Sequence, residues 1–481
     1  MKFSFPLKIY FVALVLRLIP ILLTMNLGIG LDDMFQYDML ARSLASGHGF
    51  RWYAQEDLKL LEPYVDFDLS TASGYDPQYG LYTSFRAPLY PSFLALVYSI
   101  SGLGFTRFFA ARIAQGILLG ALLAPLAYLV SKQFFFLYSL NESLVEKISR
   151  LSAWIVACYP MLIVYPLVLG TENLFFILLL SSFYYLLITL KSPTGSNLLL
   201  SGILLALTVL TRSVAFPFAV FAILYLFYFH RTKALTVLIA FVLVLAPWFV
   251  RNSLLHNKLT GIETSLGYNL YLGYHPEGNG SFIFGPSLDL LTIMDDAERD
   301  AVGTRKAIEF IRAEPKRFVP LAVYRLGFFF GLEKRGLIYF YSNNILGYIP
   351  AFLLLLISVV LLLPFVFVCI FAVLGFTAIK FSPQKNLLNL LFLGYILPHV
   401  LILSEDRFHL ALIPFFAILA AMAFILLREH KYSQFMSPMT SAMAVMLILL
   451  LTLNWGLELN RDAYQIAALL GPFGNQMYFP Y

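Results

Sequence analysis

Charged residues are scarce in this chain of 481 residues: Asp, Glu, Lys and Arg together make up 12% of it, whereas 60% is hydrophobic. A typical soluble chain is about 25% charged. So few charges could not keep the surface of a soluble enzyme in water, and we exclude that class. Disordered chains are poor in aromatic residues, whereas this chain is 16% aromatic. The composition therefore predicts an integral membrane protein with several spans.

Cysteines and nucleotide-binding or metal-binding motifs are also lacking. The two cysteines, Cys158 and Cys369, lie in apolar runs, so we expect no disulfide framework. No glycine-rich loop precedes a Lys-Ser or Lys-Thr pair, which argues against ATP-driven transport. Without an HExxH or CxxC motif, we expect no cofactor and no metal, with a divalent ion at Asp66 and Asp68 as the open alternative. The net charge of +6 indicates cytoplasmic loops rather than a nucleic-acid partner.

Long hydrophobic runs, by contrast, are abundant. A membrane-spanning helix needs about 20 mostly apolar residues, and about 11 such runs, within a range of 10 to 13, predict an all-α membrane protein. The run 198–229 contains Arg212, where we expect a kink or break, and 318–332 is a candidate for a further short or re-entrant span. The eleven runs are 8–26, 87–105, 109–130, 151–169, 173–190, 198–229, 234–250, 350–379, 386–403, 409–427 and 439–456.

Lysine and arginine in short loops predict the orientation, because cytoplasmic loops carry an excess of both. With the N-terminus in the cytoplasm, nearly all the basic loops fall on the cytoplasmic side. The loop 131–150 disagrees, since it falls on the outer side although it carries Lys132, Lys147 and Arg150. We expect the functional site on the extracytoplasmic face of the membrane.

Two long polar segments interrupt the spans, and both fall on the outer face. The first, 27–86, belongs to an N-terminal transmembrane catalytic module, 1–250. The second, 251–349, includes a predicted amphipathic helix over 296–313, where apolar and charged residues alternate at helical spacing. A C-terminal transmembrane module, 350–481, follows. Functional residues usually lie in such loops on a rigid scaffold.

Asp32 and Asp33 follow the first span directly and stand at the membrane–water boundary. Aspartate is a favoured N-cap residue, so Asp32 could simply begin the next helix. The alternative is a general base at the lipid interface. Both interpretations hold if one aspartate caps the helix and the other reacts.

Basic and aromatic residues stand at the ends of two spans. Arg86, shortly before Tyr90, either anchors the second span at the interface or binds a phosphate through its paired donors. Composition does not decide between these roles. Trp248 and Arg251 end the seventh span on the outer face.

Further charges lie in a tight turn or within apolar sequence. Glu405 and Arg407 occupy an outer turn that is either a plain polar hairpin or a second basic contact for an anionic substrate. Arg212 lies deep in an apolar run, where a charge is costly and therefore a functional hypothesis by default. The same applies to Glu172, for which the alternative is a short solvated turn.

In this order, the motifs resemble the GT-C membrane glycosyltransferases, and especially the bacterial family-39-like proteins related to protein O-mannosyltransferases and lipid A aminoarabinose transferases. That family has an acidic residue after the first span, followed by spaced Tyr, Ala, Leu and Gly residues, and an Arg-x-Pro-Leu-Tyr-Pro entry to the second span. The matching residues are Asp33, Tyr37, Ala41, Leu44, Gly47, Gly49 and Phe50, and then Arg86-Ala87-Pro88-Leu89-Tyr90-Pro91. Leu210-Thr211-Arg212, Pro247-Trp248-x-x-Arg251-Asn252 and Glu405-x-Arg407 with Pro414 are similar to its later landmarks. The resemblance extends from about residue 10 to about residue 430.

The resemblance implies a GT-C fold and transfer of a sugar from a polyprenyl-phosphate-linked donor to a lipid, glycan or protein acceptor, by inverting displacement without a metal. It implies Asp33 as the general base, with Asp32 beside it. The implied phosphate ligands are Arg86, Arg251 and Arg407, and the residues expected to contact the sugar or shape the site are Tyr37, Tyr90, Trp248 and Glu405. The alternative is a transporter or flippase of polyprenyl-linked sugars. Repeated halves with broken helices would favour a transporter, and the sequence shows no such halves.

Overall fold

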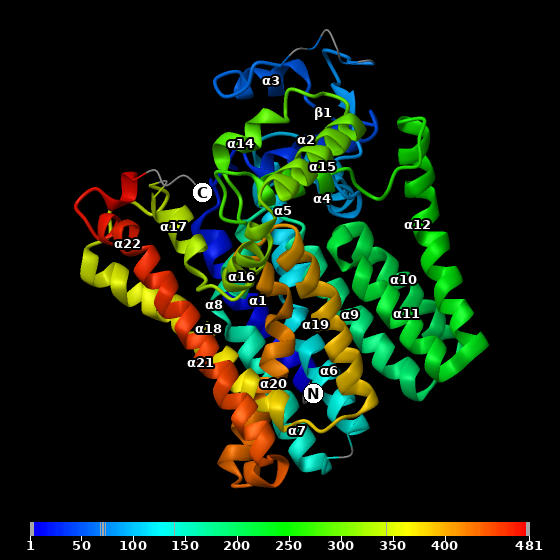
Figure 1. Cartoon of the computed structure of the whole chain (residues 1–481), viewed down its shortest axis with the longest axis vertical. Coiled ribbons are helices and arrows are strands. Elements are labelled where there is room, and N and C mark those ends of the chain that lie inside the picture. The colour runs from blue at the N-terminus through cyan, green and yellow to red at the C-terminus, as the bar shows by residue number, and fades with distance from the viewer. Residues whose placement is uncertain are drawn as a thin grey trace.

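The computed structural model describes residues 4–67, 69, 72, 74–138, 140–342 and 344–477, and this part of the chain is almost wholly helical (Figure 1). The helices up to residue 255 are α1 (Phe5–Leu23), α2 (Asp33–Ala45), α3 (Gln55–Leu61), α4 (Leu89–Ser101), α5 (Thr106–Ala114), α6 (Leu123–Leu137), α7 (Glu142–Cys158), α8 (Pro160–Val164), α9 (Glu172–Lys191), α10 (Gly195–Thr211), α11 (Phe216–His230) and α12 (Leu235–Leu255). Those that follow are α13 (Leu266–Tyr274), α14 (Phe284–Asp289), α15 (Asp296–Ala313), α16 (Phe318–Phe329), α17 (Lys334–Ser342), α18 (Ala351–Ala378), α19 (Pro383–Leu401), α20 (Ile413–Arg428), α21 (Pro438–Arg461) and α22 (Ala463–Leu469). The π-helix η2 (Gln115–Gly120) joins α5 to α6, and the 3₁₀ turns include η3 (Tyr165–Leu167), η4 (Ser213–Ala215), η5 (Arg231–Ala234) and η7 (Phe408–Leu412). The strands β1 (Arg51–Trp52) and β2 (Leu81–Tyr82) form a short antiparallel pair.

Seven helices or helix runs within the described residues are long and apolar enough to cross a membrane, and α7 with α8 and η3, bent by 57°, would be an eighth. The chain is therefore an all-α integral membrane protein, but the expected count of about 11 spans is not confirmed. The single run Ser213–Leu255 includes the second half of the expected span 198–229 and the whole of the expected span 234–250. In addition, α4 has only 13 residues, and α19 carries Lys385 and several amide side chains near its start.

The expected break at Arg212 is confirmed, because this residue has an extended backbone (φ −148°, ψ 115°) between α10 and η4. The region expected to form a short span at 318–332 is α16, a helix of 12 residues. At 1.5 Å per residue it is about 18 Å long, which is too short to cross a hydrocarbon core of about 30 Å. The amphipathic helix α15 has the predicted bounds.

Contacts between distant segments place the N-terminus and the starts or ends of several helices at one end of the bundle, the lower end in Figure 1. Lys147 near the start of α7 forms an ion pair with Glu429, which follows α20. The Arg150 guanidinium lies 5.1 Å from the centroid of the Phe5 ring. We call this the N-terminal end of the bundle.

This arrangement places the loop 131–150 at the same end of the bundle as the start of α1, whereas the eleven-span prediction put the two on opposite sides. The loop lies at the N-terminal end, and the Tyr138 hydroxyl there accepts a hydrogen bond from the Lys380 backbone N–H (2.7 Å). The physical reason is the length of α4, which at about 20 Å is too short to cross the membrane. The run Thr106–Leu137, by contrast, is long and apolar enough to cross. The basic residues of the loop then share one end of the bundle with the other basic turns, as the positive-inside rule favours.

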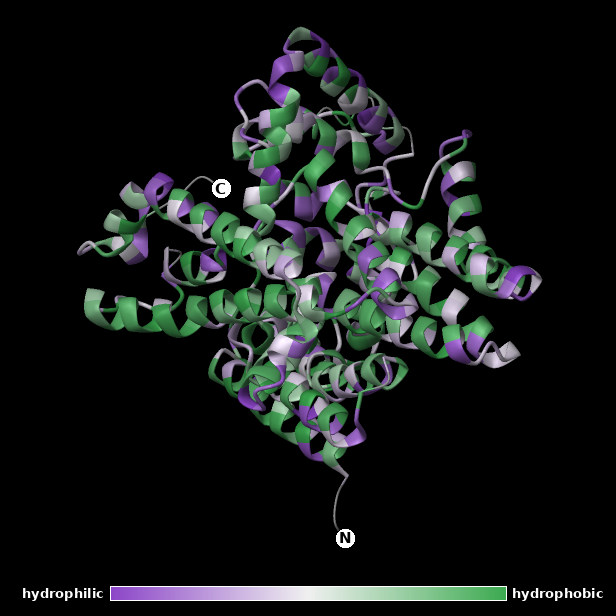
Figure 2. Cartoon of the chain, turned by 60° about the horizontal axis from the view of Figure 1, so that its bottom comes forward, coloured by the Kyte–Doolittle hydropathy of each residue, from purple (hydrophilic) through white to green (hydrophobic). Residues whose placement is uncertain are grey.

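The opposite end of the bundle carries a polar cap, which we define as α2, α3, β1, β2 and α13 to α15 (Figure 1). Figure 2 shows hydrophobic residues along the long helices, whereas hydrophilic residues gather in the cap and at helix ends. Within the cap, α13 and α15 approach closely, and the Gly267 N–H donates to the Asp300 carboxylate (2.6 Å).

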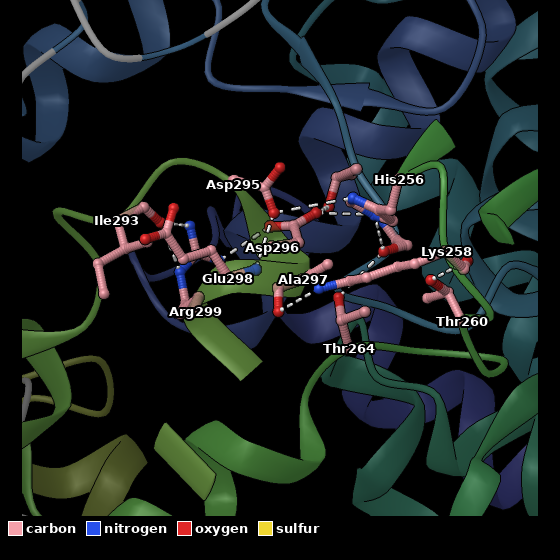
Figure 3. Close-up of polar contacts among 12 residues, drawn as sticks. His256, Lys258, Thr260, Thr264, Ile293, Asp295, Asp296, Ala297, Glu298 and Arg299 are labelled. Carbon is pink, nitrogen blue, oxygen red and sulfur yellow. Dashed lines mark hydrogen bonds and ion pairs between the residues drawn. The ribbon is translucent and has the colours of Figure 1, made fainter. Parts of the chain in front are cut away.

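A buried polar network joins the two outer loops inside the cap (Figure 3). Asp296 Oδ2 accepts hydrogen bonds from the Thr83 hydroxyl (2.5 Å) and the Ser84 N–H (2.9 Å). Its other oxygen lies 3.0 Å from Arg299 Nη1, and Ser84 Oγ lies 2.7 Å from His256 Nε2. The network holds the segment that leads from β2 into the site described below.

Candidate active site

A cavity of about 1170 Å³ lies between the cap and the helical bundle. Residues from α2, the segment before α4, the α8–η3 turn, the break after α10, the loop before α13, α17 and the turn before α20 line it. Its arginines are Arg86, Arg212, Arg335 and Arg407, and its carboxylates are Asp32, Asp33, Glu263, Glu333, Glu405 and Asp406. The rest of the wall is largely apolar, and we call this space the central cavity.

The two aspartates after α1 have different positions, since Asp32 caps α2 and Asp33 begins it. Asp32 is the N-cap of α2, and its carboxylate accepts a hydrogen bond from the Met34 N–H (2.9 Å). This bond satisfies one of the free N–H groups of the first helical turn. Asp33 is the first residue of α2 and turns its carboxylate toward the arginines of the central cavity.

Two arginines bracket the Asp33 carboxylate. Arg86 pairs with Asp33 Oδ1, and Arg407 Nη2 lies 3.1 Å from Oδ2. Arg86 Nε also donates to the Gln36 side chain (2.8 Å). Burial alone would raise the pKa of Asp33, but the two guanidinium groups outweigh it and hold this pKa below its ordinary value. Asp33 is therefore ionised over the physiological pH range and is a weak base in this arrangement.

The charged cluster continues from Arg407 through Glu405 to Arg335, which no motif in the sequence had indicated. Arg407 Nε donates to Glu405 (2.8 Å), and Arg335 of α17 pairs with the same carboxylate oxygen (2.6 Å). Burial raises the pKa of Glu405, but Arg335 and Arg407 more than offset it and hold the pKa below the usual value. Glu405 thus links two arginines from different parts of the chain.

Arg212 and Glu172 form a further ion pair, with 2.5 Å between Nη1 and Oε1. Glu172 is buried at the first turn of α9, where the helix dipole favours a negative charge. The interpretation of Glu172 as part of a solvated turn is therefore wrong, because Arg212 supplies a buried partner. Of the two residues, Arg212 lines the central cavity.

Glu263, from the loop before α13, contacts the segments that carry two of the four cavity arginines, Arg86 and Arg212. Its Oε1 accepts a hydrogen bond from the Ser213 hydroxyl, and its Oε2 accepts one from the Ala87 N–H (3.2 Å). Ser213 follows Arg212, and Ala87 follows Arg86. No motif in the sequence pointed to Glu263, because its partners lie far away along the chain.

Tyr37 lies in the wall of the central cavity, and the Arg86 guanidinium is 5.3 Å from its ring centroid. Tyr90 contacts the Tyr37 ring edge-to-face (5.3 Å between centroids) but is buried behind the wall, where its hydroxyl donates to Gln115 (2.6 Å). Tyr90 therefore supports the site from outside it.

The structure places Arg251 and Trp248 outside the lining of the central cavity. Arg251 Nη1 donates to the Thr83 carbonyl (2.6 Å), and its guanidinium lies 4.8 Å from the Trp248 ring centroid. The Trp248 indole N–H donates to the Ile262 carbonyl (2.8 Å). Both side chains tie α12 to the cap.

His409 shares a buried contact with Glu333, another cavity residue without a signal in the sequence. His409 Nε2 lies 3.1 Å from Glu333 Oε1, which also accepts a hydrogen bond from the Tyr159 hydroxyl (2.5 Å). His409 Nδ1 lies 2.6 Å from the Phe329 carbonyl, which can only accept, so Nδ1 carries a proton. The Glu333–His409 contact then requires one further proton, held by either partner.

The described residues contain no group of three or more His, Cys, Asp or Glu side chains placed to hold a metal ion. Of the pair Asp66 and Asp68, the second lies outside the described residues. Metal independence therefore stays a prediction.

No protein-family model and no curated protein matches the chain. Among solved structures, it is similar to an oligosaccharyltransferase from Archaeoglobus fulgidus in complex with zinc and sulfate, at 16% identity and a TM-score of 0.43, over 99% of this chain and 54% of that one. It is also similar to ArnT from Cupriavidus metallidurans bound to undecaprenyl phosphate, at 12% identity and a TM-score of 0.38, over 87% and 77%. For the apo state of ArnT the values are 11%, 0.37, 86% and 77%. The chain spans about half the length of the archaeal enzyme.

Proposed function

We propose that the chain is a membrane glycosyltransferase of the GT-C class that moves a sugar from a polyprenyl-phosphate-linked donor to an acceptor. The observation that carries this proposal is Asp33 between Arg86 and Arg407 in a large, mostly apolar cavity. Transfer from such a donor needs a base for the acceptor proton, cations for the leaving phosphate and an apolar surface for the lipid. The central cavity offers all three.

In the proposed reaction, an acceptor hydroxyl or amine attacks the sugar carbon that carries the phosphate. The carbon–oxygen bond to the phosphate breaks, its electron pair stays on the polyprenyl phosphate, and the acceptor proton goes to Asp33. Attack from the face opposite the phosphate inverts the configuration at that carbon. Arg86 and Arg407 take up the charge that develops on the leaving phosphate. No metal is needed in this scheme.

Donor binding and activation of the base are linked in this arrangement. With both arginines paired to it, Asp33 has a lowered pKa and accepts a proton poorly. A donor phosphate competes for the same guanidinium groups, because Arg binds phosphate and carboxylate through the same paired donors. When either arginine turns toward the phosphate, Asp33 regains basicity at the moment that the acceptor must be deprotonated.

The remaining residues have supporting roles in the proposal. Tyr37 and Glu405 face the cavity and can contact the sugar. Arg212 and Arg335 pair with the buried carboxylates of Glu172 and Glu405. The polyprenyl tail lies along apolar residues of α11 and α12 that line the same cavity, namely Phe216, Pro217, Leu245 and Phe249. The acceptor is a lipid, a glycan or a protein.

We further propose that the N-terminal end of the bundle faces the cytoplasm and the cap faces the extracytoplasmic side of a bacterial inner membrane. The basic turns gathered at the N-terminal end support this orientation, because cytoplasmic loops carry an excess of Lys and Arg. A polyprenyl-linked sugar exposed at the outer leaflet would then reach the central cavity directly.

The test is sugar transfer by the purified full-length protein, given a radiolabelled polyprenyl-phosphate sugar and a membrane extract as acceptor. We expect Asp33→Asn to lose transfer by at least about 100-fold, the scale of a positioned general base. Glu298→Gln is the matched control, since Glu298 is an exposed carboxylate of α15, and it should transfer like wild type.

Equal transfer by wild type and Asp33→Asn would overturn the role of Asp33 as the base. If neither transfers sugar but the labelled donor crosses the membrane of reconstituted vesicles, the transporter alternative is favoured instead.

A further inference from the structure

A second cavity, of about 620 Å³, lies between α7 and α20 at the N-terminal end of the bundle. Three basic residues line it, Lys147 and Arg150 from α7 and Arg428 from the last turn of α20, together with one carboxylate, Glu429. Because Lys147 pairs with Glu429, the start of α7 lies beside the end of α20. We call this cavity the basic groove.

Glu429 is the one carboxylate among the described residues that line the groove, and it does not balance the three cations there. Glu429 pairs with Lys147 and also with Lys431 (3.2 Å), which lies outside the groove. The exposed Arg428 side chain makes no hydrogen bond or ion pair with any residue that the structure describes. Among the described residues, Arg428 is therefore without a partner, and Lys147 shares its partner Glu429 with Lys431.

Arg150 has a partner outside the groove, since its Nε pairs with Glu146 (2.7 Å) on the preceding turn. Glu146 in turn also contacts Lys132 at 3.4 Å, so this carboxylate is shared between two cations. Exposed pairs of this kind contribute little to stability. Arg150 can therefore turn from Glu146 to an anion in the groove at small cost.

Aromatic side chains continue the groove toward the middle of the bundle. Trp154 lies one helical turn after Arg150, and Phe424 lies one turn before Arg428, so each shares a helix face with its arginine. The two aromatic residues are 44% and 45% exposed. The groove is thus basic at the end of the bundle and apolar further in.

We infer that the basic groove binds an anionic membrane lipid, with the phosphate headgroup on Lys147, Arg150 and Arg428 and an acyl chain along Trp154 and Phe424. Basic pockets between transmembrane helices on the cytoplasmic side are suited to anionic headgroups. A tryptophan at the membrane interface places its apolar ring among acyl chains. This inference does not depend on the proposed glycosyltransferase activity.

The test uses quenching of Trp154 fluorescence by brominated lipid in the purified full-length protein. The chain has four tryptophans, and of these Trp154 has the large exposed surface. We expect brominated phosphatidylglycerol to quench at lower concentration than brominated phosphatidylcholine. Trp154→Phe should remove this lipid-specific quenching, which assigns the signal to the groove.

Removal of the groove charges should weaken binding of phosphatidylglycerol. Each basic residue near an anionic lipid is worth about a fivefold change in affinity, the equivalent of about 1 kcal/mol. Arg428→Gln alone breaks no ion pair of the described residues and should cost about fivefold. The triple variant Lys147→Gln/Arg150→Gln/Arg428→Gln should abolish the preference over phosphatidylcholine.

The matched control removes three exposed lysines elsewhere in the loops and helix ends, in the triple variant Lys191→Gln/Lys233→Gln/Lys380→Gln, and it should keep the preference. Equal loss in both triple variants would show general attraction to a charged surface and overturn the inference. So would equal quenching by the two lipids in wild type. Displacement of brominated phosphatidylglycerol by soluble glycerol phosphate would also overturn it, because a free phosphate site would not need the acyl chain.

Discussion

Two arginines that are distant in the sequence lower the pKa of the Asp33 carboxyl. Arg86 comes from the end of the first outer loop, and Arg407 comes from the turn before α20. A carboxylate between two guanidinium groups stays ionised, and its pairing contributes to stability only while it is charged. The ion pairs of Asp33 therefore affect both its basicity and the stability of the folded protein.

This coupling predicts a pH dependence of stability. Because folding lowers the pKa of Asp33, its contribution is present above the unfolded pKa of about 3.9 and is lost as the pH falls toward the folded pKa. We expect Arg407→Gln to cost about 1 kcal/mol near pH 7 and to lose less stability than wild type on acidification. Thermal unfolding of the purified protein between pH 7 and pH 3 would measure both effects.

Arg251→Gln is the matched control for this prediction, since the structure pairs Arg251 mainly with backbone carbonyls and not with a carboxylate. It should lower stability by a similar amount at every pH. If Asp33→Asn showed the same acid dependence as wild type, the ion pairs at Asp33 would not contribute.

The sequence predicted several members of the central cavity and missed others for a physical reason. Asp33, Arg86 and Arg407 lie in local motifs next to apolar runs, so the sequence alone indicates them as candidate site residues. Arg335 and Glu263 lie in the long second outer loop, where charged residues are common. Only the folded chain shows that they contact the other charged segments.

At the scale of elements, the cap depends on close backbone contact between α13 and α15. A Cβ atom on Gly267 would lie 1.9 Å from the Asp300 carbonyl oxygen, and one on Gly303 would lie 2.5 Å from the Gly267 oxygen. Neighbours of Gly267 in α13 line the central cavity. The fit of these two helices therefore determines one wall of the site.

Gly267→Ala should separate α13 from α15 and destabilise the protein by about 2 kcal/mol, because backbone atoms cannot move aside as a flexible side chain can. Gly285→Ala in α14 is the matched control, since a Cβ there meets open space, and it should be neutral or slightly stabilising. Thermal unfolding and limited proteolysis of the cap would measure the difference. Equal behaviour of the two variants would contradict the close contact.

The sequence predicted that a helix exists where the hydrophobic pattern is strong, but it did not predict the length of each helix. The alternation of apolar and charged residues predicted the bounds of α15, and Arg212 within an apolar run predicted the break after α10. By contrast, the run at 87–105 is apolar enough for a span, but Gly102 at φ 80° ends α4 after 13 residues. Apolar composition cannot tell a span from a short helix that packs under a cap.

For the whole molecule, that short helix changes the side on which the following chain lies. Because α4 is too short to cross and Thr106–Leu137 is long and apolar enough, the loop 131–150 lies at the N-terminal end. The basic residues of that loop, which contradicted an eleven-span topology, then agree with the positive-inside rule. The site and the basic groove consequently lie at opposite ends of the bundle.

The side assignment predicts which positions share an aqueous compartment. In a Cys158→Ser/Cys369→Ser background, we expect Ser143→Cys and Ser433→Cys to react with a membrane-impermeant maleimide from the same side of sealed vesicles. Both serines are exposed, at the start of α7 and after α20, and the Lys147–Glu429 pair links these two regions. Ser46→Cys, at the exposed end of α2 in the cap, should react from the opposite side only. If Ser143→Cys and Ser46→Cys reacted from the same side, the loop 131–150 would lie on the same side of the membrane as the cap. The basic groove would then not face the cytoplasmic leaflet.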